Sequence, residues 1–438
     1  MSPARKRYAL VGTGSRAEMF VRAIARDHAD TASLVALCDL NPHRVAAHQR
    51  LLAGFGAPPA AEHTAEEFVD MLAKEQVDTV IVTTMDSTHA DYITAALRNG
   101  CDVLTEKPMT TDADGCRRIL DAVAETGRSV GVTFNYRFNP VHEQLKVLLD
   151  EGAIGEIGSV HFEWLLDVRH GADYFRRWHR DKANSGGLLV HKSGHHFDLV
   201  NWWLSARPVE VHAMGRLFFY GAEGRRHGYA RDYDRAHGAE AAKDDPFALH
   251  LADNPRLREL YLDAEDADGY QRDRNVFADG ITIEDDLAVL VRYDTGATMT
   301  YHLTAYAPWE GYRVMVNGSR GRLELEVVES DHVSPAGATT VKGAALHGDE
   351  AAAERGHVRL TLHPFWEPSR EIPVDGHSRE GHGGADVRMT AILLGAATDP
   401  LNRSATERDG ALALLTGLAA NEALTTGRPV RVADLLSL

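Results

Sequence analysis

The sequence predicts an α/β protein with two domains: an N-terminal doubly wound parallel sheet of the Rossmann type, then an α+β domain with a largely antiparallel open sheet. Short apolar runs alternate with longer amphipathic segments up to residue 138, which is typical of successive βα units. After residue 140 the apolar residues alternate with a period of two, which is typical of antiparallel strands. The length of 438 residues also favours two domains over one.

Five apolar runs in the first domain are the expected strands: YALVG, SLVALCD, DTVIVTT, DVLTE and SVGVTF. Helices are expected over about 16–27, 42–55, 86–99 and 112–126, because each segment begins near a capping residue and ends at a polar residue or a glycine. We therefore place the first domain at residues 1–138.

The second domain, residues 139–438, is expected to begin with a helix over 141–150. Strands follow in IGSVHFEWLLDV, PVEVHAMGRLF, LAVLVRYDTGATMTYHLTAY and RVMVNGSRGRLELEV. Residues 229–280 are rich in Asp, Arg and Gly and predict a long insertion, which could be a lid or a subunit contact. A final helix over 409–426 is expected to pack back against the first domain.

The composition excludes several classes of protein. A formal net charge of −17 argues against a nucleic-acid-binding surface, because neutralising phosphates requires clustered Lys and Arg. No stretch approaches the ~20 apolar residues of a membrane-spanning helix, and no apolar leader is present. Cys38, Cys101 and Cys116 have no disulfide-like or metal-like spacing. These features favour a cytoplasmic protein.

The run YALVGTGSRAEMF places Gly12 and Gly14 directly between a strand and a helix. Such a turn lets backbone N–H groups, here including those of Ser15 and Arg16, approach a pyrophosphate at the helix N-terminus. The third glycine position holds Ala17, an accepted small variant. A strand, a glycine turn and a helix also occur as a purely structural device, so the motif needs a second feature.

That second feature is Asp39, at the end of the next strand. A carboxylate there can accept hydrogen bonds from the adenosine ribose, and it would repel a 2′-phosphate, so NAD is favoured over NADP. The alternative role for Asp39 is a helix cap before Pro42, and Arg44 could weaken the preference by reaching outward.

Four further motifs resemble the Gfo/Idh/MocA family, named for glucose–fructose oxidoreductase and inositol dehydrogenase. They are TTMDSTH ending at His89, EKP at 106–108, NYRF at 135–138 and SGGLLVHKSGHHFD at 185–198. The resemblance spans nearly the whole chain. It implies that the lysine of EKP lies between nicotinamide and substrate, and that the second-domain sheet closes the active site. It also implies cofactor contacts from Thr84, His89, Glu106 and Asn135, and a homo-oligomer, dimeric or tetrameric, formed through the open sheet.

Lys107 lies on the loop beyond a strand's carboxyl end, where ligands of parallel sheets bind. Its ammonium can hydrogen-bond a substrate hydroxyl and stabilise the alkoxide that develops as hydride leaves. The alternative is an exposed surface lysine. Glu106 could orient Lys107 or contact the nicotinamide ribose.

Members of the family commonly have Asp-x-Gly-x-His after the glycine pair, with the histidine as acid/base. Alignment on Gly186-Gly187 puts His195 at the histidine position and His191 at the aspartate position, so the orienting carboxylate is missing, and Ser193 replaces the glycine. If the stretch is helical, His191 and His195 share one face, next to His196.

Three interpretations of these histidines remain open. In the first, His195 moves the hydroxyl proton while His191 binds sugar hydroxyls. In the second, His191 and His195 hold a divalent metal with a third ligand such as His302 or a carboxylate. In the third, His196 is structural and only His195 is functional.

Further residues are expected at the substrate, because aromatic faces stack on sugar rings and Arg binds oxygen anions. The family positions favour Arg137, Trp178, His179, Arg180 and Lys182, with ordinary surface packing as the alternative. Glu310, Tyr312 and His382 are weaker candidates.

The sequence thus favours an NAD-dependent oxidoreductase acting on a hydroxyl of a sugar, a sugar derivative or a cyclic polyol. One alternative is a redox-neutral glycoside hydrolase or lyase that retains NAD and oxidises its substrate only transiently, with or without a metal. Another is a non-catalytic NAD-sensing regulator, against which Lys107 and His195 argue.

Overall fold

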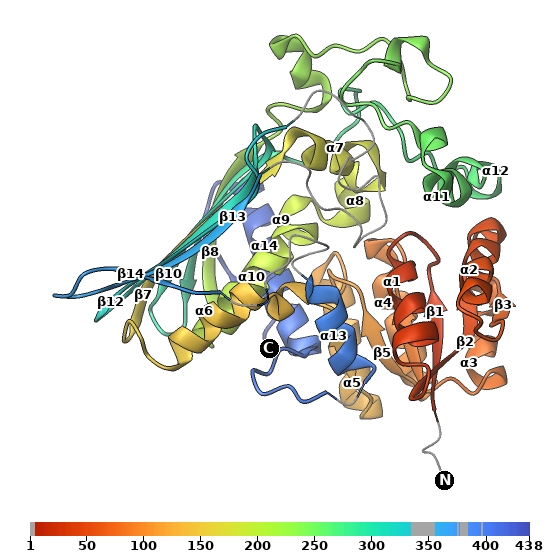
Figure 1. Cartoon of the computed structure of the whole chain (residues 1–438), viewed down its shortest axis with the longest axis horizontal. Helices are drawn as coiled ribbons and strands as arrows, with labels where there is room; N and C mark the ends of the chain where they lie inside the picture. The colour runs from red at the N-terminus through yellow and green to blue at the C-terminus, as the bar shows by residue number, and fades with distance from the viewer. Residues whose placement is uncertain (1–4, 334–354, 375, 377–383, 396) are drawn as a thin grey trace.

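The computed structural model describes residues 5–333, 355–374, 376, 384–395 and 397–438. In this part of the chain the strands form two sheets (Figure 1). Sheet A has the strand order β15-β6-β5-β4-β1-β2-β3, and sheet B has the order β14-β13-β12-β11-β7-β10-β9-β8-β16. Sheet A is mostly parallel and sheet B mostly antiparallel, which confirms the predicted fold class.

Sheet A carries the glycine turn at its centre. Its strands β1 (Lys6–Val11), β2 (Ala32–Cys38), β3 (Ala61–His63), β4 (Thr79–Val82), β5 (Asp102–Thr105) and β6 (Val130–Val132) are parallel. The strand order reverses at β1, which lies between β2 and β4, so a ligand crevice is expected at the carboxyl ends of these strands. The expected strands are present. The sequence did not indicate β3 or the antiparallel β15 (Ala405–Thr406), because so few residues show no alternation.

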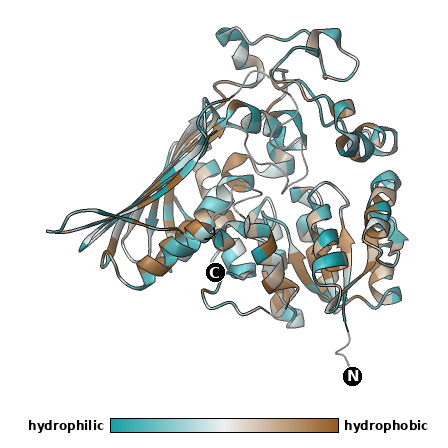
Figure 2. Cartoon of the chain, viewed as in Figure 1, coloured by the Kyte–Doolittle hydropathy of each residue, from teal (hydrophilic) through white to brown (hydrophobic). Residues whose placement is uncertain are grey.

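Helices cover sheet A on both faces, so its apolar strands are enclosed (Figure 2). They are α1 (Ala17–Arg22), α2 (Pro42–Gly54), α3 (Phe68–Lys74), α4 (His89–Arg98) and α5 (Ala113–Thr126), of which α3 was not predicted. The segment expected as one helix over 16–27 changes to a π-helical turn at Ala23–Asp27. The cap of α2 is the side chain of Asn41, which accepts a hydrogen bond from His43 N.

Sheet B consists of long strands with one face turned to a helical layer. In it β7 (Ile157–Asp167) and β10 (Thr298–Ala307) are parallel neighbours, whereas the other neighbours are antiparallel. The remaining strands are β8 (Pro208–Arg216), β9 (Asp286–Tyr293), β11 (Glu310–Gly318), β12 (Gly321–Ser330), β13 (His357–Pro364), β14 (Arg370–Ile372) and β16 (Val430–Arg431).

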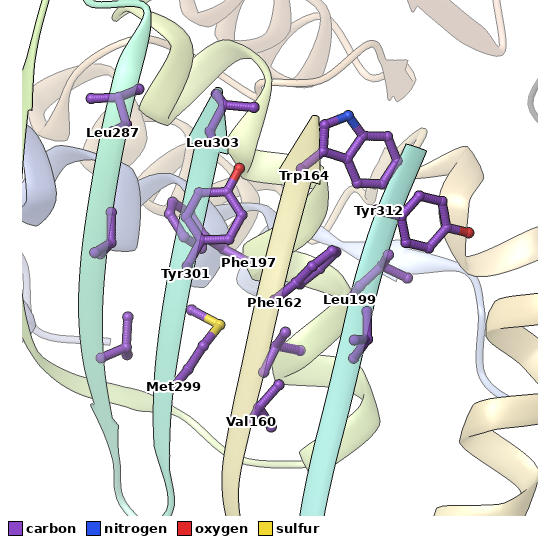
Figure 3. Close-up of a cluster of buried hydrophobic side chains, with 14 of the residues drawn as sticks. Val160, Phe162, Trp164, Phe197, Leu199, Leu287, Met299, Tyr301, Leu303 and Tyr312 are labelled. Atoms are coloured by element: carbon purple, nitrogen blue, oxygen red, sulfur yellow. The ribbon is translucent and has the colours of Figure 1, made fainter. Parts of the chain in front are cut away.

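The inner face of sheet B packs against α6 (Pro140–Asp150), α10 (Ser193–Leu204) and α14 (Glu407–Thr426). Figure 3 shows Phe162, Trp164 and Tyr301 of the sheet lying against Phe197 and Leu199 of α10. Because alternate residues face the helices, the period-two pattern of the sequence corresponds to one buried face.

The C-terminal segment joins the two halves. Helix α14 follows β15, and its Ala411 and Leu414 lie in the same core as Val132 of β6, as expected for a final helix that packs back. Outside the insertion, the described residues also form the helices α7 (Val168–Arg176), α8 (Lys182–Ser185), α9 (Leu188–His191), α13 (Ala385–Leu393) and α15 (Val432–Leu435). Among the described residues, no helix combines the length and apolarity needed to cross a membrane.

The insertion crosses back to the first domain. Its α11 (Pro255–Leu257) and α12 (Glu265–Asp268) lie next to α2 in Figure 1. Leu257, Leu260 and Tyr261 form a small apolar cluster with Ala47 of α2. This part of the insertion therefore makes a contact within the chain.

Candidate active site

A cavity of about 900 Å³ lies between the carboxyl ends of the sheet A strands and the second domain. Its volume falls within the range of about 300–1,000 Å³ typical of ligand sites. Both domains supply its walls. The sequence-predicted residues that line it are Gly12, Gly14, Ser15, Arg16, Asp39, Thr84, Glu106, Lys107, Asn135, Trp178, His179, His191, His195, Glu310 and Tyr312.

The glycine turn forms the floor of one end. Gly12 has φ +89°, and a Cβ on it would lie 2.6 Å from the backbone of Thr83 and Thr84 at the end of β4, so only glycine fits. The N–H of Ser15 points into the cavity region and donates to the Tyr261 hydroxyl at 3.0 Å. The turn therefore has the close backbone approach and the directed donor that a dinucleotide phosphate requires.

Asp39 secures this turn. Its Oδ2 accepts hydrogen bonds from Thr13 N at 2.5 Å and Thr13 Oγ1 at 2.9 Å, and its Oδ1 accepts from Asn41 N at 2.8 Å. Arg44 does not reach outward, because its Nη1 pairs with Asp268 of the insertion at 2.8 Å.

A buried polar network connects the turn to the end of β5. Arg16 pairs with Glu106 at 2.7 Å and with Asp386 of α13 at 3.0 Å, and Asn135 Nδ2 donates to Asp386 at 2.8 Å. Burial alone would lower the pKa of Arg16, but the two carboxylates raise it. Asp386 was missed in the sequence, although it ends the GHGGAD run. His382 of that run lies outside the described residues.

Lys107 lines the cavity two residues after the end of β5. Its Nζ donates to the backbone oxygen of His191 at 3.1 Å and lies 3.4 Å from His191 Nε2. Burial lowers the pKa of Lys107 to about 8, although Asp86 and Glu106 act in the opposite direction. The amine can therefore exist in both protonation states near neutral pH.

Asp86 orients His191. The His191 Nδ1–H donates to Asp86 Oδ2 at 2.5 Å, which leaves Nε2 as an acceptor facing Lys107. The sequence did not indicate this carboxylate, which Asp86 of the TTMDSTH run supplies to His191 from the other domain. Burial raises the pKa of Asp86 and lowers that of His191, so the imidazole is neutral.

His191 and His195 do not share one uninterrupted helical face, because the helix breaks at Lys192, between α9 and α10. The His195 ring stacks on Tyr136 with centroids 4.3 Å apart, and both rings line the cavity. Lys192, which the sequence did not single out, lines it too and donates to the Tyr136 hydroxyl at 3.0 Å.

His196 points into the core instead. It bonds to the Tyr301 hydroxyl at 2.7 Å and stacks on Trp164, which agrees with its structural interpretation.

His302, named as a third ligand in the metal hypothesis, does not line the cavity that His191 and His195 line. His302 pairs with Asp286 at 3.2 Å and is 41% exposed, whereas its neighbours Tyr301 and Leu303 are buried on the inner face of sheet B. The described residues contain no cluster of three or more His, Cys, Asp or Glu side chains suited to a metal ion.

A hydrogen-bonded polar wall faces Lys107 from the second domain. His170 Nδ1 donates to Glu310 at 2.7 Å, and the Tyr174 hydroxyl lies 3.4 Å from His170 Nε2. Tyr312 bonds to His142 at 2.7 Å. His170 and Tyr174 were not predicted, because α7 carries no motif; the only signal was the density of aromatic and basic residues in VRHGADYFRRWHR.

Four residues predicted to contact substrate or cofactor lie outside the cavity lining. Lys182 was expected at the substrate, but it pairs with Glu284 at 2.5 Å. Arg137 was expected at the substrate, but it forms a buried ion pair with Asp198 at 2.6 Å. Arg180 was expected there too, but it donates to the backbone oxygens of Asn275 and Asp279 in the insertion. His89 was expected at the cofactor, but it bonds to the backbone oxygen of Pro108 at 2.8 Å. Each side chain has polar partners inside the protein.

The glycine turn, the lysine at the sheet edge and the antiparallel wall together define a two-domain, NAD-binding oxidoreductase. Residues 6–134 match the family model described as the NAD-binding Rossmann fold of an oxidoreductase family, and residues 146–432 match that family's C-terminal alpha/beta domain. The chain therefore belongs to the Gfo/Idh/MocA family of oxidoreductases, and it is an enzyme of the dehydrogenase type.

Among its relatives is YteT of Bacillus subtilis (strain 168), which is 32% identical over 99% of both chains. An inositol 2-dehydrogenase of Rhizobium meliloti (strain 1021) is 30% identical over 52% of this chain and 62% of its own length. The solved structure of the WlbA dehydrogenase from Bordetella pertussis with NADH and UDP-GlcNAcA is similar with a TM-score of 0.64, at 19% identity, covering 99% of this chain and 100% of that one. The aldose-aldose oxidoreductase from Caulobacter crescentus has a TM-score of 0.63 at 17% identity, over 98% and 100%. Both structures have the same fold.

Proposed function

We propose that the protein is an NAD-dependent oxidoreductase that acts on a hydroxyl of a sugar, a sugar derivative or a cyclic polyol. The observation that carries this proposal is Lys107, a half-buried amine with a pKa of about 8 in the same cavity as the glycine turn. An amine that titrates near neutral pH can exchange a proton with a hydroxyl. Relatives named inositol 2-dehydrogenase support a polyol as the substrate.

In this proposal Lys107 and His191 manage the hydroxyl proton. Neutral Lys107 accepts it as the alcohol is oxidised, and the resulting ammonium stabilises charge on the oxygen. His191 Nε2 then accepts a hydrogen bond from that ammonium, because Asp86 holds the Nδ1–H. His195 is proposed as a second acid/base that contacts the substrate. Bound NAD supplies the hydride acceptor.

The remaining cavity wall suits a ligand rich in hydroxyls. The pair of His170 and Glu310 offers both a donor and an acceptor, and the hydroxyl of Tyr174 adds another. Trp178 and Tyr312 provide aromatic surface for the C–H face of a ring. Arg137 and Arg180 have no part in this proposal.

We propose NAD rather than NADP as the cofactor. Asp39 presents a carboxylate at the end of β2, where a 2′-phosphate would be repelled. Arg44, which could have compensated, is held by Asp268 through its Nη1.

We further propose a homo-oligomer formed through the outer face of sheet B, where Met214 and Leu290 are 69% and 53% exposed. We also propose a cytoplasmic location, where the three buried, free cysteines would stay reduced.

The direct test is absorbance of NADH during incubation of the protein with NAD and a panel of inositol isomers and aldoses. Each oxidised substrate molecule should yield one NADH, and Lys107→Met should lower kcat about 100-fold or more. Lys74→Met, at a lysine whose side chain is 72% exposed, is the matched control and should leave kcat unchanged. Product formation without accumulation of NADH would refute the proposal in favour of redox-neutral turnover.

A further inference from the structure

The insertion contacts the cofactor side of the first domain through polar side chains as well as through the apolar cluster around Tyr261. Asn41 Nδ2 donates to the backbone oxygen of Ala264 at 2.9 Å, and Arg44 pairs with Asp268 at 2.8 Å. Arg256 of the insertion pairs with the buried Glu18 of α1. These contacts flank both the glycine turn and Asp39, so the insertion covers the dinucleotide crevice from the outside.

Within this contact Tyr261 reaches the phosphate-binding turn itself. Its hydroxyl accepts the Ser15 N–H at 3.0 Å, and it is the nearest atom, at 3.6 Å, to a Cβ built on Gly14. In a dinucleotide turn such a backbone donor is directed at a phosphate oxygen. A phosphate that takes this donor therefore comes within reach of the Tyr261 hydroxyl.

Two further donors of the same wall have no partner within the described part of the chain. The Tyr270 hydroxyl and the Nε of Arg177 are buried there without a hydrogen bond, and both residues line the cavity. Arg177 pairs with Asp173 at 2.8 Å, but this carboxylate also faces Arg176 at 3.7 Å. Buried donors left without partners are costly, so this arrangement favours an anionic ligand.

We propose that Tyr261 and Tyr270 of the insertion, together with Arg177, form a second half of the dinucleotide site that binds the pyrophosphate from the side opposite the glycine turn. The inference rests on the proposed use of a dinucleotide. It assigns the insertion a function: the cofactor is enclosed between two domains, and its release requires the insertion to separate from α1 and α2.

The experiment measures NADH dissociation from the full-length protein by displacement with excess NAD, followed by NADH fluorescence. Tyr261→Phe and Arg177→Gln should each speed dissociation about tenfold or more, the effect of losing one hydrogen bond to a charged group. Arg258→Gln, at an exposed insertion arginine that pairs with Asp263, and Tyr229→Phe, outside the cavity lining, are the matched controls and should release NADH like the wild type.

Tryptic cleavage of the wild-type protein tests the same inference without relying on a variant that has to fold. NADH and ADP-ribose, which contain the pyrophosphate, should slow tryptic cleavage at Arg258 several-fold, whereas adenosine should not. Equal cleavage with all three ligands, or wild-type NADH release from folded Tyr261→Phe and Arg177→Gln, would overturn the inference. A protein that binds NADH through these residues but oxidises neither sugars, sugar derivatives nor cyclic polyols would refute the proposed function and leave this inference standing.

Discussion

The acidity of Lys107 determines how the oxidation rate should depend on pH. With a pKa of about 8, about one amine in eleven is neutral at pH 7 and about ten in eleven at pH 9. If neutral Lys107 accepts the hydroxyl proton, kcat/KM for alcohol oxidation should rise about tenfold between these values and then level off. Carbonyl reduction, which needs the ammonium, should fall over the same range.

Asp86→Asn shifts this profile in a direction that the structure fixes. The Asp86 carboxylate raises the pKa of Lys107, so its removal should move the rising part of the curve of kcat/KM against pH to lower pH. Loss of the hydrogen bond between Asp86 and His191 should lower kcat/KM about tenfold or more at high pH, where the curve is level. Asp91→Asn, at a 70% exposed aspartate of the neighbouring helix, is the control. A profile that is flat between pH 6 and 10, or a limb that moves to higher pH in Asp86→Asn, would refute this account of the site.

Three further changes test other parts of the structure. Asp39→Ala should lower the preference for NAD over NADP about tenfold or more, measured as the ratio of the two kcat/KM values, and an unchanged ratio would remove Asp39 from the cofactor assignment. Gly12→Ala should lower the free energy of unfolding in urea by about 2 kcal/mol or more and abolish NADH binding, because the positive φ and the 2.6 Å approach to the Thr83–Thr84 backbone exclude a Cβ. A stable variant that binds NADH would contradict the geometry of the turn. Arg137→Met should lower the free energy of unfolding by about 3–5 kcal/mol, because it leaves Asp198 buried without its counter-charge. The folded protein should keep the wild-type KM. A raised KM with unchanged stability would place Arg137 at the substrate after all.

Several residues proposed to bind the cofactor could be placed at the cavity because their requirements are local in sequence. Gly12 is needed by the turn in which it lies, and Asp39 and Lys107 follow the strands that carry them to the edge of sheet A. Strand ends in a parallel sheet meet at one edge whatever the rest of the chain does. The residues beside the cofactor crevice were therefore recognisable without the fold of the second domain.

The proton-handling half could not be predicted in the same way. Asp86 and His191 are 105 positions apart, and no local pattern distinguishes an aspartate that orients a histidine from one that caps a helix. Arg137 was expected at the substrate, but it binds a buried carboxylate 61 positions away. The sequence motif around an arginine does not distinguish these two roles. Residues 254–272 lack periodicity because they pack on α2 and not on a layer of their own domain.

The chemistry of Lys107 also depends on how the two domains pack, since Lys107 and Asp86 come from the first and His191 from the second. Helix α14 packs on the first domain through Ala411 and Leu414 and on α9 at Gly417. At Gly417 an added Cβ would lie 2.5 Å from the backbone oxygen of Leu189 in α9, the helix that ends at His191. Gly417→Ala should therefore displace α9 and admit water to Lys107.

With its amine hydrated, Lys107 should regain a higher pKa, so the rising limb of the oxidation profile should move to higher pH and kcat/KM at pH 7 should fall about tenfold. The control is Gly54→Ala, on a helix where an added Cβ meets nothing within 4 Å. A variant in which hydrogen exchange shows α9 to be loosened, but whose oxidation rate keeps the wild-type pH dependence, would mean that Lys107 owes its low pKa to the first domain alone.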